Sequence, residues 1–179
     1  EFARTGIIEN NPIHKDMIFA ARAARLEFIV NVVINSKKEV IYAVSGDVEK
    51  AHEKGVGFLN GFCKVKAVDN DIVITTNGGY PLDQNVYQAV KGMTAAEATV
   101  NDGGVIIMAA KSADGHGGEH FYNTFKNEKD FDKLTERFLA TPAEKTIPDQ
   151  WQSQIFARIL KKAKVIYVSD CDDEMIKDL

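Results

Sequence analysis

The chain has 179 residues, of which 45% are hydrophobic and 27% charged, so it is long and apolar enough for one substantial core or two small ones. Its formal net charge of −4 and the lack of a basic cluster argue against a nucleic-acid-binding protein. No apolar stretch is long enough to span a membrane, and no signal peptide opens the sequence. We therefore expect neither a nucleic-acid partner nor a membrane partner.

The cysteines and the two ends of the sequence indicate where such a protein works and how much of it is present. Cys63 and Cys171 lie far apart and give neither a disulfide framework nor a metal-ligand spacing, which favours a reduced, cytoplasmic protein. The sequence opens on Glu1 without a methionine and stops at Leu179 within a pattern. We expect it to be a piece of a longer chain.

The first third of the sequence predicts a helix, a hairpin and a second helix. The Asn-Asn-Pro sequence at 10–12 is typical of a helix start, with an Asn cap and a proline in the first turn. The β-branched and aromatic runs 28–34 and 39–44 are separated by a short polar turn and predict a β-hairpin. Asp47 is expected to cap the helix that follows.

A different pattern, in which strands and helices alternate, begins near Asp69. In chain order we expect a strand at 71–76, a helix at 82–98, a strand at 104–110, helices at 121–125, at 130–139 and from 148, and a strand at 164–169. This order implies parallel pairing through right-handed crossovers. The predicted fold is α/β, a Rossmann-like mostly parallel sheet with flanking helices, preceded by the tail end of another α/β domain. The expected domains are 1–68 and a truncated 69–179, joined around 66–70.

The stretch SADGHGGEH at 112–120 contains the order H-x-x-E-H, which can mark a zinc peptidase. Such a site needs a helix that brings both histidines to one ion. Each of the two intervening glycines costs a helix interior about 1 kcal/mol relative to alanine, so no helix should begin before Gly118. His116 should then lie in a loop, with His120 in the first helical turn. We expect no metal ligand in this chain.

Two glycine-rich loops follow predicted parallel strands directly. One contains Gly78 and Gly79, and the other, at 114–118, contains His116. In open α/β sheets, ligands bind outside the carboxyl ends of the strands, where glycines allow backbone N–H groups to approach them. Either loop alone is explained by a tight turn. Two loops at one sheet edge favour a site, to which these three residues are possible contributors.

The helix predicted after the first glycine loop carries a second candidate site. Gln88 and Lys91 are three residues apart and Tyr87 and Lys91 four apart, so all three can share one helix face. A lysine beside an amide and a phenol suits a small carboxylate or phosphate. A solvated surface lysine is the alternative. Trp151, in the first turn of the helix from Pro148, fits a core anchor or an indole N–H that faces a ligand.

Several segments together resemble the C-terminal half of the nickel-pincer-nucleotide-dependent lactate racemase family. They are NPIHKDM at 11–17, FIVNVVIN at 28–35, DIVITTNGGYPLDQNVYQAVKGM at 71–93, GGVIIMAAKSADGHGGEHFY at 103–122 and PDQWQSQIFARIL at 148–160. The resemblance covers essentially the whole chain in the right order. It implies a substrate bound between two α/β domains and racemisation by hydride transfer to and from a nickel-pincer mononucleotide, through a 2-oxo acid.

The resemblance also implies roles for particular residues. The family's Tyr-Gln-x-x-Lys helix closes the site; Gln88 and Lys91 match its substrate-carboxylate ligands, and Tyr87 and Trp151 match residues near the cofactor. The cofactor-bearing lysine, the nickel ligand and the acid/base histidines should lie upstream of Glu1. The resemblance therefore implies no catalytic residue in this fragment, no cofactor bound to it alone and no racemase activity of its own.

Two functions from different classes follow. The first is a fragment of a 2-hydroxyacid, lactate-type racemase or epimerase (an isomerase), whose partners are the small 2-hydroxy acid and its own missing N-terminal domain. The second is a non-catalytic α/β module that binds a small molecule. An upstream segment with the tethering lysine and paired histidines would favour the enzyme.

Overall fold

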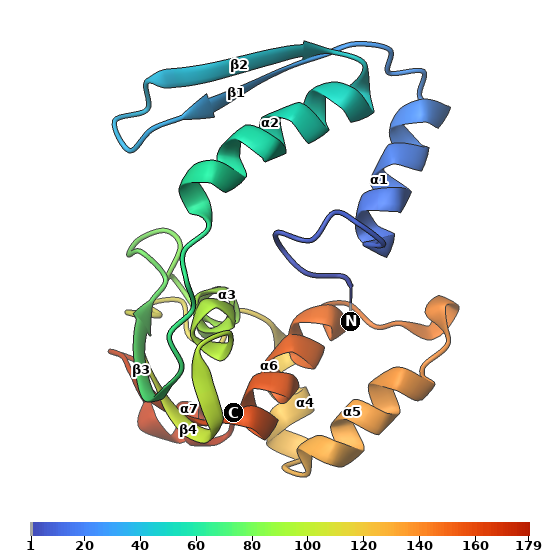
Figure 1. Cartoon of the computed structure of the whole chain (residues 1–179). Coiled ribbons are helices and arrows are strands. Elements are labelled where there is room, and N and C mark those ends of the chain that lie inside the picture. The colour runs from blue at the N-terminus through green and yellow to red at the C-terminus, as the bar shows by residue number, and fades with distance from the viewer. Residues whose placement is uncertain (1) are drawn as a thin grey trace. The chain divides into compact units, whose positions relative to one another are not determined.

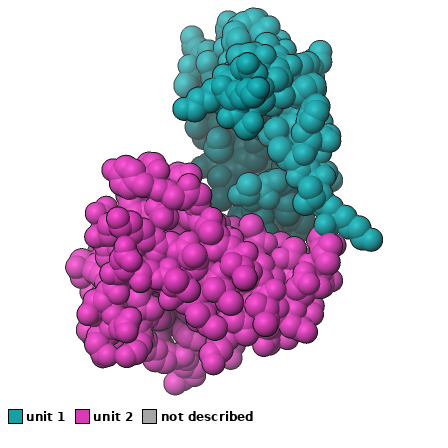
Figure 2. Space-filling model, turned by 90° about the vertical axis from the view of Figure 1, so that its left-hand side faces the viewer, with its two compact units in different colours: residues 1–66 teal, residues 67–179 magenta. Residues whose placement is uncertain are grey.

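The computed structural model describes residues 2–179 and divides into two compact units, Glu1–Lys66 and Ala67–Leu179 (Figures 1 and 2). Each unit contains its own sheet, and no strand pairing joins the two sheets within the described residues. None of the helices in residues 2–179 combines the length and apolar character that crossing a membrane requires. We call residues 1–66 unit 1 and residues 67–179 unit 2.

Unit 1 consists of two capped helices and a hairpin, as the sequence predicts. Its elements are α1 (Pro12–Ala23), β1 (Ile29–Ile34), β2 (Val40–Gly46) and α2 (Val48–Cys63). The Asn11 side chain accepts hydrogen bonds from the first turn of α1, and Asp47 does the same for α2. Strands β1 and β2 pair antiparallel, which confirms the hairpin.

Unit 1 buries few apolar side chains. Its buried apolar side chains are Val44, Val48 and Ala51. Along β1, alternate residues point to the same face of the hairpin, and that face remains open. The exposed fractions of its side chains are 62% for Phe28, 68% for Val30, 52% for Val32 and 53% for Ile34.

Unit 2 is an α/β fold around a parallel sheet. Its elements are β3 (Asn70–Thr76), α3 (Val86–Glu97), β4 (Val100–Ala109), α4 (Glu119–Asn127), α5 (Phe131–Ala140), the 3₁₀ turn η1 (Ala143–Lys145), α6 (Gln150–Lys162), β5 (Lys164–Val168) and α7 (Asp173–Lys177). The strand order is β3-β4-β5, and both pairs are parallel. This confirms the predicted parallel α/β sheet with flanking helices.

Three elements differ from the sequence-based expectation. Helix α3 begins at Val86 rather than at residue 82, because the preceding residues form turns and the Asn85 side chain caps the helix by accepting from the backbone N–H of Gln88 at 2.9 Å. Strand β4 begins at Val100, where an irregular register with β3 accommodates extra residues. The five-residue helix α7, capped by Asp172, was not predicted because it is too short to show a helical period.

The core of unit 2 lies on one side of its sheet. Helices α3 and α6 pack there, and Phe121, Phe125 and Leu134 are fully buried with them. The other side of the sheet carries apolar side chains that are exposed: Ile72 at 61%, Ile74 at 73%, Ile166 at 46% and Val168 at 54%. The sheet is therefore covered by helices on one face only within the described residues.

Candidate functional site

The two glycine loops meet at the carboxyl ends of neighbouring strands. Thr76 and Ala109 are register partners in β3 and β4, so the loops that follow them start side by side. The backbone N–H of Val86 donates to the carbonyl of Gly115 at 3.0 Å, and that of Tyr87 donates to the carbonyl of His116 at 3.1 Å. The second loop thus holds the start of α3 in place. The prediction that both loops share one sheet edge is confirmed.

Glycine is required in these loops by conformation and by space. Gly78 and Gly79 have φ angles of 81° and 79°, in the left-handed region that other residues rarely adopt. Gly117 has a φ of 83°, and a Cβ atom there would lie too close to the Asn85 side chain. The tight-turn explanation therefore accounts for all three glycines, and a contribution of Gly78 or Gly79 to ligand binding stays a prediction.

The exposed face of α3 brings the predicted polar residues together. The Lys91 ammonium donates to Gln88 Oε1 at 2.7 Å and lies 5.9 Å from the centre of the Tyr87 ring. Val86 and Val90, on the opposite face, are 1% and 0% exposed and fix the helix on the core. Lys91 forms no ion pair with any carboxylate in residues 2–179, so its charge is available to an anion.

Tyr87 lies between the core and the surface. Its ring meets Phe121 edge-on at 5.7 Å and Trp151 edge-on at 6.1 Å between ring centres. Burial, followed by the negative charge of Asp149, raises the pKa of Tyr87 to about 12. The phenol therefore keeps its proton at neutral pH and is a hydrogen-bond donor there.

The start of α6 completes this arrangement. Trp151 is 50% exposed, so it lies at the edge of the core, where the indole covers Tyr87 from outside. The next residue, Gln152, is fully buried and its amide donates to the carbonyl of Tyr87 at 2.6 Å, which ties α6 to α3. Asp149, with a φ of 63°, makes the turn into α6. Sequence reasoning missed Asp149 and Gln152, because their roles depend on contacts with a distant helix.

His116 is held within its own loop. Its ring stacks on Tyr122 at 4.6 Å between centres, and its Nδ1 accepts from the backbone N–H of Gly118 at 3.1 Å. Helix α4 begins at Glu119, as the glycines predicted, so the H-x-x-E-H order does not lie on one helix. Across residues 2–179, no three His, Cys, Asp or Glu side chains are grouped so that they could hold a metal ion.

The chain is similar to known proteins in both sequence and fold. The family model of the lactate racemase C-terminal domain matches residues 65–179. The chain belongs to this family. The lactate racemase of Thermoanaerobacterium thermosaccharolyticum is 56% identical over 179 residues, which are 99% of this chain and 42% of that protein. The lactate racemase of Lactiplantibacillus plantarum is 56% identical over 171 residues, which are 96% of this chain and 40% of that protein.

A solved structure extends this likeness to three dimensions. The lactate racemase apoprotein from T. thermosaccharolyticum superposes with a TM-score of 0.93 at 56% identity, covering 99% of this chain and 43% of that one. The chain therefore spans less than half the length of the racemases it matches. Its likeness includes unit 1, which lies almost entirely outside the residues matched by the family model.

Within this member of the lactate racemase C-terminal domain family, the predicted site residues fall into two groups. Tyr87, Gln88, Lys91 and Trp151 lie together and form what we call the α3–α6 cluster. The second group lies in the loops at the sheet edge and consists of Gly78, Gly79 and His116. The two glycines allow the turn, and His116 stacks on Tyr122 and accepts from the backbone N–H of Gly118.

Proposed function

We propose that this chain is the substrate-binding part of a 2-hydroxyacid racemase or epimerase of the lactate racemase type, an isomerase, in which Lys91 and Gln88 bind the substrate carboxylate. The observation that carries the proposal is the α3–α6 cluster, which presents a lysine without a carboxylate partner in residues 2–179 beside an amide and a protonated phenol. Relatives that are 56% identical along the chain are named lactate racemases, which favours the enzyme over the non-catalytic module.

Each residue of the cluster has a definite task in this proposal. The Lys91 ammonium neutralises the carboxylate, and its hydrogen bond to Gln88 Oε1 fixes its direction while the Gln88 NH₂ stays free to donate. The Tyr87 hydroxyl keeps its proton next to Asp149, so it adds no negative charge to the cluster. The half-exposed Trp151 indole provides an apolar wall that excludes water from the bound acid.

The sequence resemblance implies a nickel-pincer nucleotide whose tether and protein ligand belong to segments that match no part of residues 2–179. Residues 2–179 contain no group of three His, Cys, Asp or Glu side chains suited to a metal ion. The proposal therefore assigns the cofactor tether, the nickel ligand and the acid/base histidines to the part of the protein outside these residues. That part would carry the hydride chemistry, and the residues described here hold the carboxylate and close the site.

The proposal is tested by Lys91→Ala in the full-length, cofactor-loaded protein. Losing a charge-assisted hydrogen bond to the carboxylate in a site that excludes water should cost about 2–4 kcal/mol, or roughly 30-fold to 1000-fold in kcat/KM for lactate racemisation. Thermal unfolding should be nearly unchanged, because Lys91 lies on the exposed face of α3. The matched control is Lys133→Ala on the surface of α5, which should keep normal activity. Near wild-type racemisation by Lys91→Ala would show that Lys91 is a solvated surface residue.

A further inference from the structure

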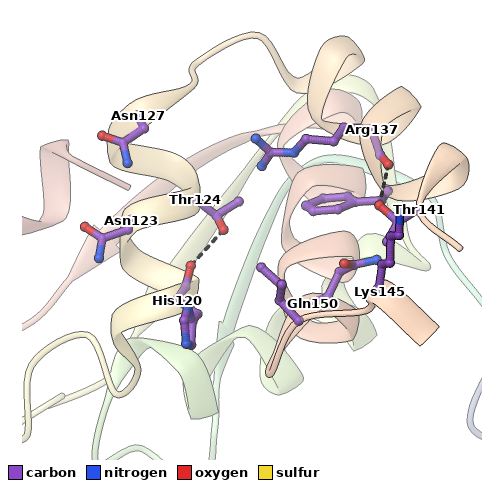
Figure 3. A pocket seen from close by; sticks show the side chains of 10 residues that line it. His120, Asn123, Thr124, Asn127, Arg137, Thr141, Lys145 and Gln150 are labelled. Carbon is purple, nitrogen blue, oxygen red and sulfur yellow. Dashed lines mark hydrogen bonds between the residues drawn. The ribbon is translucent and has the colours of Figure 1, made fainter. Parts of the chain in front are cut away.

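A polar hollow lies between α4, α5 and the start of α6 in unit 2 (Figure 3). Its volume is about 320 Å³, at the lower end of the size of small-molecule sites. It includes no residue of the α3–α6 cluster. The polar side chains that define it are His120, Asn123, Asn127, Arg137, Lys145 and Gln150.

The charged side chains that line the hollow are positive. Arg137 and Lys145 are its fully charged groups, and no Asp or Glu is among the residues that line it. Neither cation pairs with a carboxylate anywhere in residues 2–179. Figure 3 shows the Arg137 guanidinium reaching from α5 toward α4, across the hollow rather than away from it. An unpaired guanidinium in this position presents its fork of N–H donors to whatever enters.

Gln150 supplies a neutral amide at the α6 end of the hollow. The residue is 8% exposed and lines the hollow, and solvent reaches its side-chain amide there. The hydroxyls of the same wall are satisfied, since Thr124 donates to the carbonyl of His120 at 2.7 Å and Thr141 donates to that of Arg137 at 2.8 Å.

We propose that this hollow binds the oxyanion group, phosphate or carboxylate, of a small molecule. Arg137 provides a bidentate guanidinium contact, Lys145 a second positive charge, and the Gln150 amide a neutral donor from the buried end. Asn123 and Asn127 on α4 also line the hollow, although Figure 3 shows their side chains on the side of α4 away from Arg137. The role goes beyond the proposed racemase function, which uses none of these residues.

The test is isothermal titration calorimetry of the full-length protein with sodium phosphate and, separately, sodium succinate, at constant ionic strength set by chloride. We expect at least one anion to bind with a Kd of about 1 mM or lower. Arg137→Gln should raise that Kd by about tenfold or more, because it removes a bidentate charged contact. Lys133→Gln removes one positive charge from the same helix without touching the hollow and should change the Kd by less than about twofold.

Two further variants keep the result tied to this hollow. Gln150→Met removes the buried amide without changing the charge and should also weaken the anion; its thermal unfolding without anion reports whether it folds. If it does not fold, the Arg137 and Lys133 pair decides. Lys91→Ala removes the anion-binding residue of the α3–α6 cluster and should leave this Kd unchanged, so the two proposals can fail separately.

The outcomes are distinct. Binding of phosphate alone supports a phosphorylated ligand, binding of succinate alone supports a carboxylic acid, and binding of both supports a general oxyanion site. The proposal is overturned if neither anion binds with a Kd of about 1 mM or lower. It is equally overturned if Arg137→Gln binds as tightly as the parent protein.

Discussion

Unit 1 and unit 2 are built from the same kinds of element, a sheet with helices packed on it, but they bury their apolar side chains very differently. In unit 2, Phe121, Phe125 and Leu134 are 0% exposed in a core shared by α3, α4, α5 and α6. In unit 1, α1 buries no residue, and α2 buries only Val48 and Ala51. Both helices of unit 1 have a side-chain cap, whereas α4 and α6 of unit 2 have none, so local structure alone does not make a core.

Unit 1 buries fewer apolar side chains because fewer helices and strands pack against one another in it. A two-stranded hairpin with helices on one side is marginal in water, because it leaves one apolar face of the hairpin exposed. Unit 1 keeps Phe28 and Val30 at 62% and 68% exposure on that face. This agrees with the prediction that unit 1 is the end of a domain whose other elements lie outside the present residues, and that assignment stays a prediction.

The largest difference between the two units is expected when each is studied as a separate polypeptide. A polypeptide of residues 67–179 should unfold cooperatively in urea, because its core is complete on the helical side of the sheet. A polypeptide of residues 1–66 should show no cooperative transition by circular dichroism, because it buries too little apolar surface to offset the entropy of ordering the chain. A sharp transition in the 1–66 polypeptide would contradict the contrast.

A Phe→Ala substitution in each unit, at a buried position in unit 2 and at an exposed one in unit 1, sharpens the same comparison. Phe121→Ala, at a side chain that is 0% exposed, should lower the free energy of unfolding by about 3–5 kcal/mol. Phe62→Ala, at a side chain of unit 1 that is 67% exposed, should cost less than about 1 kcal/mol. Urea denaturation of the 179-residue protein measures both. Equal losses would mean that unit 1 has a core that its exposed side chains conceal.

The ion pairs of the two units should also differ. Glu97 is 6% exposed and accepts from Arg158 Nε at 2.6 Å and Nη2 at 2.7 Å. Glu97→Gln should cost about 1–3 kcal/mol of unfolding free energy, a range reduced because Arg158 is partly exposed. In unit 1, Arg22 pairs with Asp47 and Glu49 at the surface, and Arg22→Gln should cost clearly less. Raising the salt concentration should weaken the Arg22 pair more than the Glu97 pair.

The smallest expected effect is on the alkaline side of the stability profile. Burial raises the pKa of Tyr87 and of Tyr167 to about 12, against 10.0 for a free phenol. Between these values the unfolded chain loses phenolic protons that the folded chain keeps, so the free energy of unfolding should fall as pH rises from about 10 to about 12. Below pH 10 these two groups add no pH dependence.

Tyr87→Phe tests that assignment. It removes one of the two groups, so the loss of stability between about pH 10 and about pH 12 should be smaller than in the parent chain. Tyr80→Phe, at a residue that is 85% exposed, is the matched control and should leave the slope unchanged. Identical slopes in all three proteins would show that Tyr87 is freely ionisable in the folded state.

Local signals in the sequence predicted most of the fold. The cap at Asn11, the cap at Asp47 and the apolar strand before Asn77 act over a few residues, and the structure confirms the elements they predicted. The start of α3 was placed too early because a helical period continues through Leu82, where turn geometry prevails. Spacing also predicted that Gln88 and Lys91 would meet, since neighbours on one helix turn need no tertiary information.

The rest of the candidate site depends on contacts between distant segments. Trp151 was expected at the edge of the core and is half exposed, because Gln152 occupies the buried position of that turn. A glutamine at the centre of a helix-to-helix contact carries no signal in a hydrophobic pattern. The charge of Asp149 near Tyr87 likewise follows only from the docking of α6 on α3.

The place of β3 in the sheet has a consequence for handling the protein. With the order β3-β4-β5, one edge of β3 has no partner strand within residues 2–179, and Ile72 and Ile74 are 61% and 73% exposed on the open face of the sheet. A strand of this kind, without proline and with a single charge at Asp71, is a template for β-pairing between molecules. Preparations of these 179 residues alone should therefore be limited by concentration-dependent aggregation at 25 °C before they are limited by loss of the native fold.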